Sequence, residues 1–225
     1  MGKICTLTIP TSIEGINTTI DVGSGCIHHA VFDSGISRNR MYDILQNGDF
    51  SGSSVFVITD DIHEFTSLVN KGLGTTVSTY EAGTVAEVVE VLNDIDSVVS
   101  KRYDILNNAN KKNIECYNTW ADKHNQMKPV VIYWLGADKV LKQMKQEETY
   151  ELLKTFLRLG RAAGVTLLLH SDRLYGIREA VDNDIYAQFV QIHIPIAEDM
   201  EDMTVLTGDK EYRASVVQKD KSRLG

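Results

Sequence analysis

Short apolar runs recur along the chain and are separated by segments with helical periodicity. The runs at 55–59, 130–134 and 165–169 do not alternate between apolar and polar residues, which is typical of strands buried on both faces in a parallel sheet. Strands that alternate with helices indicate an α/β fold, with a doubly wound, mainly parallel sheet flanked by helices. The complete set of predicted strands is 4–9, 27–32, 55–59, 130–134, 165–169, 189–194 and 213–217.

Three helices are predicted between and after these strands. The first covers 84–106, opens with a capping-box signature and carries one apolar stripe along about 37 Å of helix. The second runs over about 146–163, and Gly164 just after it suits a left-handed cap. The third is predicted near 197–206 and carries a solvated acidic face.

The amino-acid composition restricts the domain organisation, the cellular environment and the kinds of partner that we expect. A chain of 225 residues that is 43% hydrophobic predicts a single domain over 1–225. Three widely spaced cysteines fit reduced thiols of a cytosolic protein. The net charge of -8 and the lack of a strong Lys/Arg cluster argue against a nucleic-acid partner. The chain as given is expected to be soluble, because no run approaches the ~20 apolar residues of a membrane span and no signal peptide opens it.

The segment after the strand at 27–32 has two interpretations. A phosphate-binding loop needs glycines, a Lys for the terminal phosphates and a Ser/Thr for magnesium. Read in this way, 33–39 has Ser37 in place of the last glycine, Arg38 in place of Lys and Asn39 in place of Ser/Thr. The alternative is an ordinary turn with Ser37 as the N-cap of a short helix to Gln46. The candidate nucleotide-binding residues are Asp33, Ser34, Gly35, Ser37, Arg38 and Asn39.

The next two buried strands also end in candidate site residues. Trp134 and Leu135 close the strand at 130–134, and Asp138 follows them either as a helix N-cap or as a metal ligand. Ser171 and Asp172 follow the strand at 165–169, where a polar group can sense a terminal phosphate. Lone histidines such as His170, and His28 with His29, lack the partner spacing of a metal site, so no metal is expected.

Four segments of the chain resemble motifs of the FtsK/SpoIIIE family of P-loop ATPases. The resemblance extends over roughly 13–210 and keeps the spacing among the motifs. It implies a RecA-like P-loop fold. The segments are HHAVFDSGISRN (28–39), RYDILNNANKKNIECYN (102–118), KPVVIYWLGADKVL (128–141) and LGRAAGVTLLLHSDR (159–173).

This resemblance also implies that the active-site motifs have degenerated. The family places Asp-Glu where Trp134 and Leu135 stand, and magnesium coordination and water activation both need carboxylates there. Asp172 near a triphosphate would repel it. We therefore expect weak binding of ATP and Mg²⁺, if any, and little or no hydrolysis.

Degenerate modules of this kind are typical of type VII (ESX/Ess) secretion coupling proteins of Gram-positive bacteria. The resemblance implies a cytoplasmic module of a parent protein anchored in the cell membrane, next to another ATPase module and in a ring oligomer. It also implies secreted helical-hairpin substrates that bind through a C-terminal signal.

Arg161 lies in the GRAAG stretch, where some family members present an arginine to a neighbouring nucleotide. We expect either this action in trans or a role as a cation at a helix end. For the whole chain, we expect a docking or regulatory module of a protein-export motor. The alternatives are a slow but genuine ATPase that uses Arg38 with Asp33 or Asp138, and a DNA translocase module.

Overall fold

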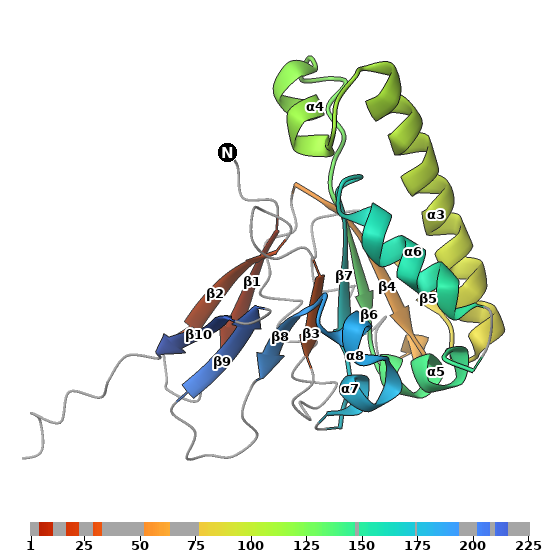
Figure 1. The fold of residues 1–225 in the computed structure, drawn as a ribbon, viewed down its shortest axis with the longest axis vertical. Helices are drawn as coiled ribbons and strands as arrows, with labels where there is room; N and C mark the ends of the chain where they lie inside the picture. Colours follow the sequence, from red (N-terminus) through yellow and green to blue (C-terminus); the bar gives the residue numbers. More distant parts are fainter. Residues whose placement is uncertain are drawn as a thin grey trace, which may run out of the picture.

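The computed structural model describes residues 5–10, 17–22, 29–32, 52–63, 77–146, 149–173, 175–193, 202–207 and 210–215. Within them, eight strands form one sheet in the order β10-β9-β8-β3-β7-β6-β4-β5. The six strands from β8 to β5 are parallel, while β9 and β10 continue the sheet in antiparallel pairing. The strands are β3 (His29–Phe32), β4 (Ser54–Thr59), β5 (Val77–Glu81), β6 (Val130–Trp134), β7 (Val165–His170), β8 (Val190–His193), β9 (Asp202–Thr207) and β10 (Lys210–Ser215). A separate antiparallel pair consists of β1 (Cys5–Pro10) and β2 (Asn17–Val22) (Figure 1).

The central strands are buried throughout, as the unalternating apolar runs predict. Every residue of β3, β6 and β7 is buried. One hydrophobic core joins this sheet to the helices that follow its strands. The helices are α3 (Val85–Asn108), α4 (Ile114–Trp120), α5 (Ala137–Met144), α6 (Tyr150–Gly160), α7 (Gly176–Ala180) and α8 (Asn183–Tyr186). The predicted parallel α/β sheet is therefore confirmed, and β7 lies between β3 and β6 as in a RecA-like fold. None of the helices in the described ranges combines the length and apolarity needed to cross a membrane.

Helix α3 begins at the predicted capping box. The Thr84 hydroxyl accepts a hydrogen bond from the Glu87 backbone N–H at 3.4 Å, and the Glu87 carboxylate accepts one from the Thr84 N–H at 3.0 Å. The Thr84 side chain also donates to this carboxylate at 2.9 Å, and together with the neighbouring backbone N–H groups it lowers the pKa of Glu87. These bonds satisfy backbone groups that would otherwise lack partners at a helix start.

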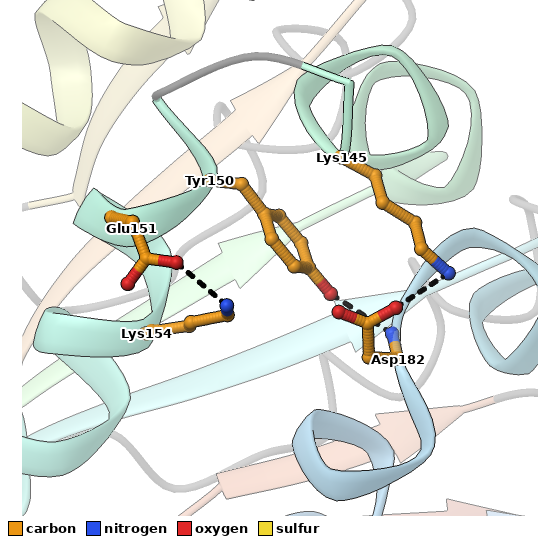
Figure 2. Close-up of polar contacts among 5 residues, drawn as sticks. All are labelled: Lys145, Tyr150, Glu151, Lys154 and Asp182. Carbon is orange, nitrogen blue, oxygen red and sulfur yellow. Dashed lines mark hydrogen bonds and ion pairs between the residues drawn. The ribbon is translucent and has the colours of Figure 1, made fainter.

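The start of α6 is tied to the end of α5 and the start of α8 by the polar contacts in Figure 2. The Tyr150 hydroxyl accepts a hydrogen bond from the Asp182 backbone N–H at 2.9 Å, and the Asp182 carboxylate lies 2.7 Å from the Lys145 ammonium group. Burial raises the pKa of Tyr150. These contacts hold the helices together at the carboxyl ends of the strands.

The turn after α6 is held at the opposite, amino ends of the strands. The Arg102 guanidinium donates to the Ala163 carbonyl at 2.7 Å and to the Lys128 carbonyl at 2.6 Å, and burial lowers its pKa. Gly164 has a φ of 72°, as predicted for a left-handed cap. A Cβ at Gly164 would lie 2.6 Å from Ile114 Cδ1, so both the backbone angle and the close approach of α4 require glycine.

The end of the chain departs from the prediction. The helix expected near 197–206 is wrong, because 202–207 forms β9, paired on one side with β8 and on the other with β10. The hydrogen bonds of these two partner strands outweigh the helical spacing of the acidic residues. Strands β2 and β5 are not among the predicted strands. The helix predicted from Ser37 to Gln46 lies outside the described residues.

Candidate functional site

The carboxyl ends of β3, β7 and β6 lie side by side, and this edge is where parallel sheets bind ligands. Phe32 at the end of β3 is paired with His170 of β7, and Trp134 at the end of β6 is paired with Leu169. The Ser171 N–H continues the pairing by donating to the Phe32 carbonyl at 3.2 Å. The candidate loop therefore starts beside Ser171. Its predicted residues, Asp33, Ser34, Gly35, Ser37, Arg38 and Asn39, lie outside the described part of the chain.

Trp134 and Leu135 are apolar and buried at the end of β6. Each is 1% exposed. Trp134 belongs to the core cluster shared with the helices, and the Leu135 N–H donates to the Ile58 carbonyl at 2.9 Å. Trp134 thus packs as a core aromatic residue.

Asp138 is not the N-cap of α5. That position belongs to Gly136, whose φ of 63° turns the chain into the helix before Asp138, and no side chain caps this start. Asp138 is instead 3% exposed, and its Oδ2 accepts a hydrogen bond from Arg173 Nε at 2.9 Å and lies 2.7 Å from Arg173 Nη2. Among the described residues, Asp138 is the one buried carboxylate, and Arg173 neutralises it.

Ser171 and Gly176 complete what we name the Asp138–Arg173 cluster: Asp138, Ser171, Arg173 and Gly176. Ser171 is fully buried, and its hydroxyl accepts a hydrogen bond from the Arg173 N–H at 3.1 Å. A Cβ at Gly176 would lie 2.1 Å from Ser171 Oγ and 3.2 Å from Asp138 Oδ2. The cluster is therefore packed so closely that α7 must begin with glycine. Sequence reasoning missed Arg173 and Gly176, although Arg173 directly follows the predicted Ser171 and Asp172.

The surroundings of the cluster are negatively charged. Asp172 is exposed, with its Oδ1 3.7 Å from Nε2 of the buried His170. We name as the carboxyl edge the described segments 60–63, 81–90, 138–145, 172–173 and 175–184, which surround the carboxyl ends of the strands (Figure 1). They hold ten acids and five bases, a net charge of -5. The acids are Asp60, Asp61, Glu81, Glu87, Glu90, Asp138, Asp172, Glu179, Asp182 and Asp184, and the bases are Lys139, Lys142, Lys145, Arg173 and Arg178.

The structure does not bring Arg161 together with the other predicted site residues. It follows α6 at the amino ends of the strands, whereas Trp134 and Ser171 lie at the carboxyl ends. Its side chain is exposed and forms no hydrogen bond or ion pair with another described residue. Its backbone is fixed, because the Arg161 carbonyl accepts from the Gly164 N–H at 3.1 Å.

The ring of His29 has a structural role, because both of its nitrogens contact backbone groups. His29 at the start of β3 accepts a hydrogen bond at Nδ1 from the Leu167 N–H at 3.1 Å, and its Nε2 lies 3.1 Å from the Leu157 carbonyl. Because Nδ1 accepts, Nε2 carries the proton and donates. Within the described segments, no three His, Cys, Asp or Glu side chains gather as metal ligands would.

The fold is similar to that of several solved ATPase structures. The cytoplasmic domain of the type VII secretion ATPase EccC from Thermomonospora curvata superposes with a TM-score of 0.65 at 15% identity, over 95% of this chain and 28% of that one. EssC (ATPases 2 and 3) from Geobacillus thermodenitrificans gives 0.60 at 10% identity, over 88% and 40%. The pCW3 conjugation coupling protein TcpA, in a monomer form with ATPγS, gives 0.52 at 17% identity, over 94% and 65%.

The present chain thus spans less than two thirds of the length of each of these proteins. No family model matches its sequence. No curated protein matches it either. At these identities the likeness concerns the fold. The chain therefore shares the fold of the FtsK/SpoIIIE-type ATPase domains found in these secretion and conjugation proteins.

Proposed function

We propose that this chain is a docking or regulatory module of a type VII protein-export motor, with weak or no ATP hydrolysis of its own. The observation that carries the proposal is the Asp138–Arg173 ion pair beside the apolar Trp134 and Leu135. A hydrolytic site needs carboxylates at this strand end to hold magnesium and to orient a water. Here the carboxylate is bound to an arginine of the same chain.

The described residues do not fit a magnesium-bound triphosphate. The side chains of Trp134 and Leu135 offer no oxygen ligand, and Asp138 Oδ2 lies within 2.9 Å of both Arg173 nitrogens that contact it. The net charge of -5 along the carboxyl edge opposes a polyanion. The proposal therefore limits nucleotide binding to weak contacts with backbone N–H groups of the predicted loop, 33–39, which lies outside the described residues.

The proposed partners follow from the proteins that share the fold. EssC (ATPases 2 and 3) contains consecutive ATPase units, and the matching EccC structure, at a TM-score of 0.58 and 9% identity, is a complex with a signal sequence peptide. We therefore propose that 1–225 is one module of a longer, membrane-anchored chain that forms a ring. Its substrates would be secreted helical hairpins, bound through a C-terminal signal.

Arg161 is the proposed link to the neighbouring module. An exposed arginine on a turn fixed by hydrogen bonds can stabilise developing phosphate charge in another subunit. Its place at the amino ends of the strands keeps it away from the carboxyl edge of its own domain, so any action on a nucleotide would be on that of a neighbour.

The test measures ATP hydrolysis by the longer chain that contains this module. We compare the native chain with Arg161→Ala and with Arg158→Ala, a matched control at an exposed arginine one turn earlier in α6. The proposal predicts that Arg161→Ala slows ATP hydrolysis by the neighbouring module at least about tenfold, as expected when one contact to the transition state is lost. The control variant should hydrolyse ATP at the native rate. An unchanged rate removes the role of Arg161. Turnover by the isolated chain would instead support the slow-ATPase alternative.

A further inference from the structure

The last turns of α3, the helix α4 and the connection to β6 form a basic corner at the amino ends of the strands. We name as the α4 corner the segment 101–128, which projects beyond the strands in Figure 1. It holds six Lys/Arg and three acids, a net charge of +3 within a chain of net charge -8. Four of the cations are exposed, and all four are lysines. The cations are Lys101, Arg102, Lys111, Lys112, Lys123 and Lys128, and the acids are Asp104, Glu115 and Asp122.

The same corner exposes large hydrophobic side chains. Three such side chains are exposed in the described part of the chain, and two of them lie here, Trp120 at 63% and Ile105 at 41%. The Lys111 ammonium group lies 5.2 Å from the indole centroid of Trp120, so a cation and an amphipathic ring are presented together. Indole rings and lysines are the side chains that anchor proteins at the headgroup level of a bilayer. The corner therefore combines the charge and the ring that a membrane-surface contact uses.

Trp120 is presented on a rigid support. The Asn118 side chain donates to the Met127 carbonyl and accepts from the Met127 N–H, each at 2.8 Å, which ties α4 to the segment before β6. The other end of α4 is fixed because the Ile114 N–H donates to the Ala162 carbonyl at 2.9 Å. A backbone held in this way loses little conformational entropy when the side chains on it bind.

We propose that the α4 corner docks onto an anionic lipid surface, with Trp120 at headgroup depth and the lysines facing the lipid phosphates. The acidic carboxyl edge does not prevent this contact. Strand β7, which runs from one end of the sheet to the other, has six residues and therefore spans about 20 Å. This is more than twice the Debye length of about 8 Å at physiological salt, so the repulsion is screened. The docked module turns its carboxyl edge away from the lipid.

The contact is separate from the functions proposed above. It uses this module's own surface, so it needs no membrane anchor elsewhere in a longer chain. It requires neither ATP binding nor Arg161.

An anionic bilayer suits the corner better than other anionic partners do. Single-stranded nucleic acids bind where several aromatic rings stack successive bases, whereas Trp120 is the one exposed Trp, Tyr or Phe side chain of 101–128. Arg102, which could bind a phosphate in a bidentate manner, donates instead to two backbone carbonyls. Peptides bind in grooves or along sheet edges, whereas the corner consists of helix ends and a connecting segment that project from the fold (Figure 1). Exposed lysines around one amphipathic ring match the headgroup region of an anionic bilayer.

Co-sedimentation of the chain with lipid vesicles tests the contact. The probes are vesicles of phosphatidylcholine mixed with phosphatidylglycerol and vesicles of phosphatidylcholine alone. We expect binding to the mixed vesicles near physiological salt, and little binding to phosphatidylcholine alone. Binding to the mixed vesicles should weaken at ~1 M salt, where the Debye length falls to about 3 Å. Equal binding to both kinds of vesicle, or binding to neither, overturns the proposal.

Two charge variants locate the contact. Lys112→Glu with Lys123→Glu reverses two exposed lysines of the α4 corner, and Lys139→Glu with Lys142→Glu reverses two exposed lysines of α5 at the other end of the strands. Both variants have the same net charge, so their comparison isolates the position of the lysines. The corner variant should bind the mixed vesicles at least about thirtyfold more weakly, because each lysine near an anionic surface contributes about fivefold. The α5 variant should bind like the native chain. Equal losses in the two variants, or native binding by the corner variant, refute docking through the corner.

Tryptophan fluorescence tests whether Trp120 enters the bilayer. The chain has two tryptophans, and Trp134 is 1% exposed, so quenching by brominated phosphatidylcholine in the mixed vesicles reports on Trp120. We expect this quenching in the native chain and its loss in Trp120→Phe. Bound chain without such quenching would contradict the proposed depth of Trp120.

Soluble polyanions test the other partners. The probes are a mixed-sequence single-stranded oligonucleotide and poly-L-glutamate, each assayed for protection of Trp120 from iodide. Neither should protect Trp120 as well as the mixed vesicles do. Protection by the oligonucleotide without quenching by brominated lipid would overturn the proposal in favour of a nucleic acid, and the same result with poly-L-glutamate would overturn it in favour of an acidic protein.

Discussion

Breaking the ion pair between Asp138 and Arg173 should destabilise the fold. Arg173→Ala leaves the Asp138 carboxylate buried, at 3% exposure, without the guanidinium that lies 2.7 Å and 2.9 Å from its Oδ2. Removing one partner of a fully buried pair costs about 3–5 kcal/mol, whereas exposed pairs contribute about 0–1 kcal/mol. The Arg173 side chain is 55% exposed, so we expect an intermediate loss of about 2 kcal/mol.

Urea denaturation of the native chain, Arg173→Ala, Asp138→Ala and the double variant measures this loss as a double-mutant cycle. The coupling between the two side chains should be about 1–2 kcal/mol, and the midpoint of thermal unfolding of Arg173→Ala should fall by about 4–8 °C. Lys139→Ala, an exposed cation in the same helix, is the control and should stay within about 0.5 kcal/mol of native. Additive losses would show that the two side chains do not interact. Asp138 would then be free to bind a metal ion, and our reasoning about the site would fail.

Three further predictions concern contacts that stabilise the fold. Gly164→Ala should lower the free energy of unfolding by about 2–3 kcal/mol, because its φ of 72° and Ile114 at 2.6 Å both oppose a Cβ. Gly83→Ala is the control and should be nearly neutral in the same urea assay. Equal losses in the two variants would refute this reasoning. Arg102→Lys should lower the free energy of unfolding by about 1–2 kcal/mol, because one ammonium group cannot donate to both carbonyls as the guanidinium does. If this variant is as stable as the native chain, the two hydrogen bonds of Arg102 do not stabilise the fold as described. Because the pKa of Glu87 is lowered in the folded state, its contribution to the stability of the fold is present above its ordinary pKa of 4.5 and is lost as the pH falls through the folded-state pKa. The stability of Glu87→Gln should therefore decrease less at acid pH than that of the native chain. If the stabilities of both proteins decrease equally at acid pH, the capping box does not contribute as described.

Elements that depend on local periodicity and on helix capping could be predicted from the sequence alone. The capping box of α3, the left-handed Gly164 and the buried strands β6 and β7 could all be predicted, because each depends on residues close in the chain or on a pattern within one strand. The sequence predicts a helix where strand β9 lies, because the acidic residues near it have helical spacing. The better signal is the Gly208-Asp209 dipeptide, since Thr207 pairs with Lys210 and a two-residue connection is typical of a hairpin.

The contacts at the site could be predicted only in part. The sequence shows directly that Trp134 and Leu135 are not carboxylates. It does not show the partner of Asp138, because Arg173 is 35 residues away along the chain. Asp138 and Arg173 meet because β6 and β7 are neighbours and because Gly136 and Gly176 set where α5 and α7 begin. Likewise, the negative charge of the carboxyl edge appears only when distant segments are assigned to the same end of the sheet.

The central claim is that the carboxyl edge lacks the groups that bind a magnesium-bound triphosphate. Calorimetric titration of the chain with Mg-ATP tests this most directly. We predict no saturable binding, or a dissociation constant weaker than about 1 mM, corresponding to about -4 kcal/mol. Micromolar binding that requires magnesium, accompanied by release of phosphate, would contradict the account.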